Sequence, residues 1–271
     1  MTLGFRSPAK INLFLHIHSK RPDGYHELSS LIQSVTLFDM VTLNHSQSDQ
    51  FSCSEKSLEN HDNLVIKARE LFRKKSGLSD AVSIHLIKNI PTEAGLGGGS
   101  SNAATVLWGL NQLFRQPFSE AELQEMSAEL GSDVPFFFSL GTAFCRGRGE
   151  IVQNIESLPL QYFNIYKPQT SLSTKDVFET LSIPDRSIQA SETTLNHFLE
   201  GKVCYENDLE LVAFQLKPEL LWLKKELQSF YSHVLMSGAG SSFFCIGKKK
   251  GTLEMPRWSV CQVNRKVGEW Y

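Results

Sequence analysis

A glycine-rich loop is the segment of this sequence best suited to bind an anion. It lies between an expected strand that ends near Ile90 and an expected helix over residues 101–114. Glycine lets the backbone approach a ligand closely and adopt positive φ, and the start of a helix has free N–H groups and partial positive charge. Together they predict a polyphosphate site, with serine hydroxyls available to phosphate or Mg²⁺. The expected contact residues are Gly95, Leu96, Gly97, Gly98, Gly99, Ser100, Ser101 and Asn102.

Other phosphate-binding motifs are absent from the sequence. There is no GxxxxGK[ST] segment of a P-loop, no GxGxxG after a strand, and no HRD or DFG segment of a protein kinase. The loop could instead be a flexible cap that only starts a helix. Three consecutive glycines before a helix are conformationally costly, however, and a bound ligand is the simplest reason to keep them.

Asp133 is the carboxylate best placed to act as a base. It stands before Pro135 and the phenylalanine run 136–138, which we expect to limit water nearby. The same side chain could instead cap the next helical segment. Lys10 is its natural partner, because an ammonium close by would keep the carboxylate ionised. The alternative for Lys10 is a solvated strand residue.

A strand near the N-terminus would position Lys10. Apolar residues fall at every second position from 11 to 17, which is the period of a strand with one buried face. The residues between them would point the other way, with His16 and His18 as structural strand residues. Asn12 would lie on the same side as Lys10 and could orient an acceptor hydroxyl. Farther on, Tyr25 and His26 follow Gly24 in a turn, a pair suited to stack on a base and hydrogen-bond its edge.

The remaining pattern mixes helices and amphipathic strands without strict alternation, which indicates an α+β fold. The segment 150–160 is a candidate boundary between domains at residues 1–150 and 151–271. The polar segments 46–60 and 182–200 are expected to be mobile loops, and the basic run 248–250 a solvated turn. We expect strands over residues 10–18, 82–90 and 162–166 and helices over residues 62–76 and 101–114. Two further helices are expected to begin at the capping box of Ser119 and Glu122 and at Pro218.

Composition narrows the class of protein. A net charge of −2 gives no bulk attraction to nucleic acid. The five cysteines include no CxxC pair, so a disulfide framework or a zinc site is not expected and a reducing cytoplasm fits best. The sequence has neither a signal peptide nor an apolar run of about 18 residues, so no membrane partner is expected. We expect a cytoplasmic protein, and a monomer or weak homodimer.

Several segments together resemble the GHMP kinases. The glycine loop is similar to the second motif of that family, and residues 236–242 are similar to its third motif, with Ala239 where the family often has serine. The matching segments are SPAKINLFL (7–15), KRPDGYHEL (20–28), PTEAGLGGGSSNAAT (91–105), LGSDVPFF (130–137), GTAFCRGRGE (141–150), NDLE (207–210) and MSGAGSS (236–242).

The resemblance implies a fold and a reaction. The fold would have an N-terminal ATP-binding domain like domain 2 of ribosomal protein S5, and a C-terminal ferredoxin-like α/β sandwich that binds substrate. ATP would be used with Mg²⁺, and no cluster of carboxylates with metal-ligand spacing is visible. Asp133 would accept the proton of the attacking hydroxyl, and Lys10 would touch the transferring phosphate.

The segment KRPDGYHEL resembles one branch of the family in particular. That branch phosphorylates the 2-hydroxyl of 4-diphosphocytidyl-2-C-methyl-D-erythritol, in the non-mevalonate route to isoprenoid precursors. There Tyr25 and His26 would hold the cytosine, with Phe178 as a second stacking aromatic; the alternative for Phe178 is a core residue. The implied substrate-binding residues are Asn12, Tyr25, His26, Thr174, Phe178, Gly238 and Gly240.

Two other functions stay open at this point. Another GHMP kinase, such as a mevalonate or homoserine kinase, would use the same loop, although neither acceptor carries a base for Tyr25 and His26. A binding or sensor protein could keep the nucleotide site without turnover, although the presence of both Asp133 and Lys10 argues against this.

Overall fold

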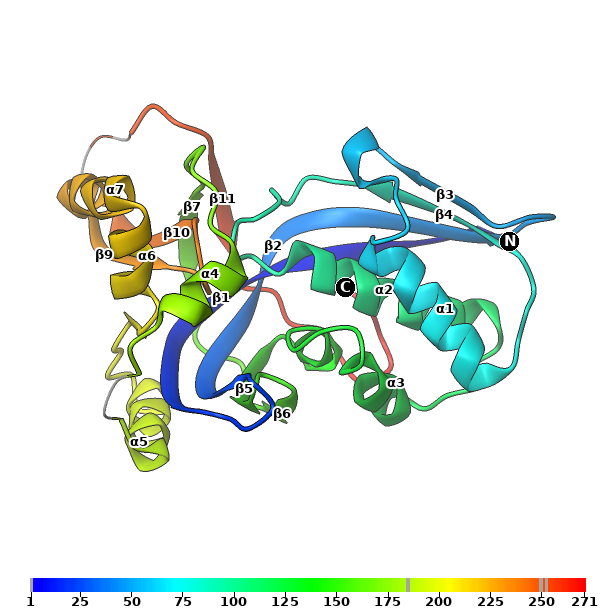
Figure 1. Cartoon of the computed structure of the whole chain (residues 1–271), viewed down its shortest axis with the longest axis horizontal. Helices are drawn as coiled ribbons and strands as arrows, with labels where there is room; N and C mark the ends of the chain where they lie inside the picture. Colours follow the sequence, from blue (N-terminus) through cyan, green and yellow to red (C-terminus); the bar gives the residue numbers. More distant parts are fainter. Residues whose placement is uncertain (1, 184–185, 249–250, 252) are drawn as a thin grey trace.

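The computed structural model describes residues 2–183, 186–248, 251 and 253–271. Two β-sheets and their covering helices lie along the long axis of the molecule (Figure 1). The strands are β1 (Thr2–Lys20), β2 (His26–His45), β3 (Gln50–Cys53), β4 (Val82–Ile87), β5 (Thr142–Gly147), β6 (Ile151–Asn154), β7 (Tyr162–Tyr166), β8 (Glu206–Asn207), β9 (Tyr231–Met236), β10 (Phe243–Lys248) and β11 (Arg257–Cys261). The helices are η1 (Lys56–Leu58), α1 (Leu64–Ser76), α2 (Gly98–Leu113), α3 (Glu120–Ser127), η2 (Pro135–Phe138), α4 (Thr174–Thr180), α5 (Ile188–Leu199), α6 (Glu210–Leu216) and α7 (Pro218–Phe230).

The larger sheet is built on the long antiparallel pair β1 and β2. Its strand order is β3-β4-β2-β1-β8, and β5 and β6 extend it from the first half of β2. The expected strand over residues 10–18 is therefore confirmed, but the expected single buried face is wrong. All residues from 7 to 17 are buried, because helices cover one side of the strand and the smaller sheet covers the other.

Helices α1 and α2 pack on one face of the larger sheet. Their apolar residues join those of β2 and β4 in one hydrophobic cluster. The expected helix over residues 62–76 is confirmed: the side chain of Asn63 caps its start, and Gly77 ends it in the left-handed conformation with φ 72°. The capping box of Ser119 and Glu122 is also present at the start of α3. Helix α2 begins within the glycine run, earlier than expected.

The smaller sheet is antiparallel, in the order β11-β7-β10-β9. One of its faces packs on β1 and β2, and the other is covered by α6 and α7. The predicted strand 162–166 and the helix that begins at Pro218 are confirmed. Two layers of helices around two sheets, one of them mixed, confirm the expected α+β class.

Two segments expected to be mobile loops contain regular structure. Residues 46–60 contain β3 and η1. Most of 182–200 is occupied by α5, whose Leu195 and Phe198 are buried; residues 184–185 lie outside the described part of the chain. Of the expected basic turn, Lys248 ends β10, and Lys249 and Lys250 also lie outside the described residues.

Three segments that follow residue 150 join the structure formed by residues 1–150. Strand β6 pairs with β5, and β8 pairs with β1. The last residues return to the N-terminal half, where Trp270 stacks on Trp108 at a ring-centroid distance of 5.2 Å. Within the described ranges, no helix combines the length and the apolar character needed to cross a membrane.

Candidate active site

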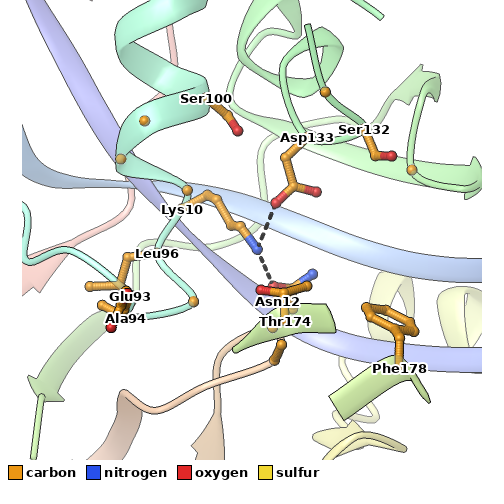
Figure 2. A pocket seen from close by; sticks show the side chains of 18 of the residues that line it. Lys10, Asn12, Glu93, Ala94, Leu96, Ser100, Ser132, Asp133, Thr174 and Phe178 are labelled. Carbon is orange, nitrogen blue, oxygen red and sulfur yellow. Dashed lines mark hydrogen bonds and ion pairs between the residues drawn. The ribbon is translucent and has the colours of Figure 1, made fainter. Parts of the chain in front are cut away.

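One cavity of about 930 Å³ collects nearly all of the predicted site residues. It lies between the glycine loop, the central part of β1 and the start of α4 (Figure 2). Two predicted residues, Ser101 and Gly240, do not line it. The predicted residues that line it are Lys10, Asn12, Tyr25, His26, Gly95, Leu96, Gly97, Gly98, Gly99, Ser100, Asn102, Asp133, Thr174, Phe178 and Gly238.

Lys10 stands at the centre of the polar contacts in the cavity. Its ammonium donates to Asn12 Oδ1 at 2.7 Å and pairs with Asp133 Oδ2 at 3.3 Å, as Figure 2 shows. The lysine side chain is 4% exposed and the aspartate side chain 39%, so the carboxylate faces the open side. The amide of Asn12 is fixed in turn, because its Nδ2 donates to Ser30 Oγ at 2.8 Å. This constellation holds a proton acceptor beside a fixed positive charge.

Limited space and positive φ both favour glycine next to Lys10. A Cβ on Gly97, whose φ is 67°, would lie 2.9 Å from Lys10 Cγ and 3.1 Å from Phe137 Cζ. A Cβ on Gly238, whose φ is 56°, would lie 3.3 Å from Lys10 Nζ. In addition, the backbone N–H of Lys10 donates to Leu96 O at 2.9 Å. Two loops far apart in sequence therefore close around one lysine.

Asp133 occupies a turn rather than a helix cap. The residue before the short helix η2 is Val134, and no side chain caps that helix. The phenylalanine run 136–138 is buried in the core and does not line the cavity, and its expected effect on water around Asp133 stays a prediction. Gly149, with φ 118°, lies near Asp133: a Cβ added to this glycine would be 3.7 Å from Asp133 Oδ1.

Aromatic rings gather at the other end of the cavity. His26 is buried, and its ring lies 5.2 Å from that of Phe178, tilted by 32°. Burial lowers the pKa of His26 below its usual value, and the Lys20 ammonium acts in the same direction. Tyr25 is half exposed, with the Arg148 guanidinium 4.8 Å from its ring centroid. A flat polar ring entering here would meet a neutral imidazole.

Ser101 and Gly240 are corrections to the predicted site. The Ser101 side chain is fully buried and accepts from Ser7 Oγ at 2.8 Å, because α2 begins at Gly98 and turns this position toward the sheet. Ser100 is the serine whose hydroxyl faces the cavity (Figure 2). Gly240 lies behind its loop, where a Cβ would lie 2.7 Å from Met236 Sδ.

Asn207, in the NDLE segment, holds the loop that carries Gly238. Its Nδ2 donates to Met236 O and to Gly238 O, both at 2.8 Å. Glu210 of the same segment accepts from the backbone N–H of Met236 at 2.9 Å. Leu209 of this segment lines the cavity, and Asn207 and Glu210 support the loop that carries Gly238.

Sequence reasoning missed Lys88, which lines the cavity beside the glycine loop, and Asp39, which lies behind it. Both side chains are almost fully buried and form an ion pair. Asp39 carried a usable signal, since an acidic residue inside an apolar strand sequence is rarely buried without partners. It also missed Asn63 and Leu64, at the start of α1, which line the cavity on the far side of the loop. Their sequence context carries no comparable signal.

Known proteins resemble the chain along nearly its whole length. The family model described as GHMP kinases N terminal domain matches residues 63–141, and the one described as GHMP kinases C terminal matches residues 194–254. A 4-diphosphocytidyl-2-C-methyl-D-erythritol kinase of Protochlamydia amoebophila (strain UWE25) is 47% identical over 267 residues, covering 98% of this chain and 91% of the relative. A chloroplastic kinase of the same name from Oryza sativa subsp. japonica is 41% identical over 294 residues, covering 99% and 73% respectively.

A solved structure extends the likeness to three dimensions. The crystal structure of 4-(cytidine 5'-diphospho)-2C-methyl-D-erythritol kinase is similar with a TM-score of 0.78 and 31% identity, covering 97% of this chain and 100% of that chain. The expected family and its two-domain fold are confirmed. The chain belongs to the GHMP kinase family, and within it to the 4-diphosphocytidyl-2-C-methyl-D-erythritol kinases.

Proposed function

We propose that this protein transfers the γ-phosphoryl group of ATP to the 2-hydroxyl of 4-diphosphocytidyl-2-C-methyl-D-erythritol. One observation carries the proposal: a single cavity joins the glycine loop, the Lys10–Asp133 pair and the aromatic end at His26. The loop suits the phosphates of ATP. The aromatic end suits the cytosine of the acceptor, and the pair lies between them, where the two substrates must meet.

The proposed chemistry follows from the positions of the polar groups. Asp133 accepts the proton of the acceptor's 2-hydroxyl group. The oxygen of that hydroxyl bonds to the γ-phosphorus of ATP, and the bond between this phosphorus and the bridging oxygen of ADP breaks. The Lys10 ammonium neutralises charge on the transferring group and remains fixed by Asn12. Free N–H groups at the start of α2 bind the phosphates of the donor.

Mg²⁺ fits the oxygen-rich edge of the same loop. Hard cations take oxygen ligands, and the residues facing the cavity there include the Ser100 hydroxyl and the Asp133 carboxylate. We propose that the ion is held mainly by phosphate oxygens, with these residues beside it. When bound, it would supply further neutralisation of the phosphate charge.

We also propose that the protein acts in the reducing cytoplasm, as a monomer or weak homodimer, without a nucleic-acid partner. All five cysteines lie in the described residues and are free thiols, three of them buried. Burial raises the pKa of Cys245 to about 12, which keeps this thiol protonated and inert.

A product assay tests the proposed function directly. The purified protein is incubated with ATP, Mg²⁺ and one of three acceptors: the cytidyl substrate, mevalonate or homoserine. We expect one added phosphoryl group on the cytidyl substrate alone, identified by mass. Phosphorylation of another acceptor would agree with a kinase but would contradict the assignment of a cytosine pocket. Nucleotide binding without any product would favour the alternative function, a binding or sensor protein without turnover.

Comparing Gly97→Ala with a control variant should distinguish the effect of crowding at Lys10 from the effect of backbone strain alone. Gly77→Ala is the matched control, because Gly77 also has positive φ but no atom lies within 4 Å of its Cβ position. Both variants should lose about 1–2 kcal/mol of stability from the left-handed backbone. Only Gly97→Ala should also lose turnover, by about tenfold or more if Lys10 is displaced by a fraction of an ångström. Equal turnover in the two variants, measured below their unfolding temperatures, would contradict the packing argument.

The pH dependence of acceptor binding should report on His26. Since the pKa of its imidazole is lowered below 6.5 in the folded protein, the ring is neutral above that pH. Protonation at lower pH would place a charge against the bound base. KM for the cytidyl substrate should therefore rise as pH falls, with a midpoint below 6.5. His26→Gln, which cannot titrate, should show no such rise, and a midpoint above 6.5 in the unmodified protein would count against this role.

A further inference from the structure

A second buried ion pair, between Asp39 and Lys88, lies beside the glycine loop. Lys88 lines the cavity, and neither residue has a step in the proposed chemistry. Asp39, on β2, has no exposed surface. Its carboxylate pairs with the Lys88 ammonium and accepts from the Asn102 side-chain amide at 2.8 Å. It also accepts from the backbone N–H groups of Asn89 and Ile90, at 2.7 and 2.8 Å. A carboxylate has about four acceptor positions, so all of them are in use.

These four donors stand on both sides of the loop. Asn89 and Ile90 lead into it from β4, while Asn102 follows it in the first turns of α2. The Asn102 amide also donates to Ser7 Oγ on β1 at 2.9 Å. One carboxylate on the sheet therefore fixes where the glycine segment leaves β4 and where it enters the helix, although the loop itself is rich in flexible residues.

Lys88 links Asp39 to the loop itself. Its ammonium also donates to Asn102 Oδ1 at 3.2 Å, and it lies 3.1 Å from the Cβ position of Gly98. The Lys88 side chain is 3% exposed, so its charge has little access to water. Loss of the carboxylate would leave an almost buried ammonium without its counter-charge beside the loop, and such a group must move or draw in water.

We propose that Asp39 is a positioning residue for the nucleotide: it holds the glycine loop in its binding geometry through Lys88, Asn102 and the backbone of Asn89 and Ile90. This inference rests on the proposed function, since it takes the loop to bind ATP. Asp39 does not line the cavity, so its effect on the nucleotide is exerted through these neighbours.

Asp39→Asn tests the proposal with the smallest change of shape. The new amide nitrogen would face N–H donors in place of an acceptor, and the charge opposite Lys88 would be lost. We expect the Kd for ADP, measured by titration calorimetry, to rise by about tenfold or more, as for loss of a charged hydrogen bond. KM for the cytidyl acceptor should change by less than about twofold, since the aromatic end of the cavity does not contact Asp39.

Asp49→Asn is the matched control for a purely structural carboxylate. Asp49 accepts from both Nη atoms of Arg73, at 2.5 and 2.7 Å, and from the backbone N–H of Val82 at 3.1 Å. The Arg73 guanidinium holds the pKa of Asp49 at about 2. It supports the same sheet but does not line the cavity or contact the glycine loop. Its asparagine variant should have a lower Tm and an unchanged Kd for ADP.

The outcomes separate this inference from the proposed function. A normal Kd for ADP in Asp39→Asn, with a Tm loss like that of Asp49→Asn, would overturn the positioning role and leave the kinase assignment intact. Failure of the unmodified protein to bind ADP would overturn both. If Asp39→Asn does not fold, Asp39→Glu decides: it keeps the charge for Lys88 but displaces the two backbone contacts, and an unchanged Kd for ADP would then reject the proposal.

Discussion

A buried ammonium needs oxygen atoms around it, and in this protein the requirement of Lys10 organises the site. The lysine side chain is 4% exposed, and an ion so far from water is stable only beside a counter-charge or strong acceptors. Asn12 supplies one oxygen from the same strand, and Asp133 supplies another from a turn more than a hundred residues away. The ion pair therefore fixes the proposed base relative to the first strand.

The same requirement explains why two glycine loops meet at this point. A side chain on Gly97 would clash with Lys10, and one on Gly238 would crowd both Lys10 and the carbonyl group of Gly95. The loops are held from behind by polar side chains on the sheets: Asn207 binds the carbonyl groups of the loop at Gly238, and Asp39 binds both flanks of the other loop. Flexible segments thus keep a defined shape because buried hydrogen bonds anchor them at their ends.

Sequence alone predicted the parts of the molecule that depend on local pattern. The helix caps at Ser119 and Gly77 and the strand at residues 162–166 follow from nearby residues, and they are confirmed. The predictions from sequence were wrong where burial depends on contacts between distant segments. The first strand is buried on both faces because a second sheet covers it, and no residue near the strand encodes that cover.

For the candidate site, the sequence motifs identified the residues but did not show in every case whether the side chain faces the cavity. Ser101 points into the protein because α2 begins at Gly98, and the helical period then turns that position toward the sheet. Lys88 and Asp39 were missed, since their pairing spans 49 residues and appears only after folding. The roles of Lys10, Asp133 and His26 remain predictions that rest on geometry and family resemblance.

The most direct test of the account is turnover and nucleotide binding in Asp133→Asn. Asparagine keeps the size of the side chain and an oxygen for Lys10, but it cannot accept the proton of the acceptor hydroxyl. The account predicts that kcat falls by about 10²–10⁴-fold, while the Kd for ADP, measured by calorimetry, stays within about twofold of the unmodified value because the glycine loop is untouched. Turnover within a few-fold of the unmodified protein would contradict the assignment of Asp133 as the base.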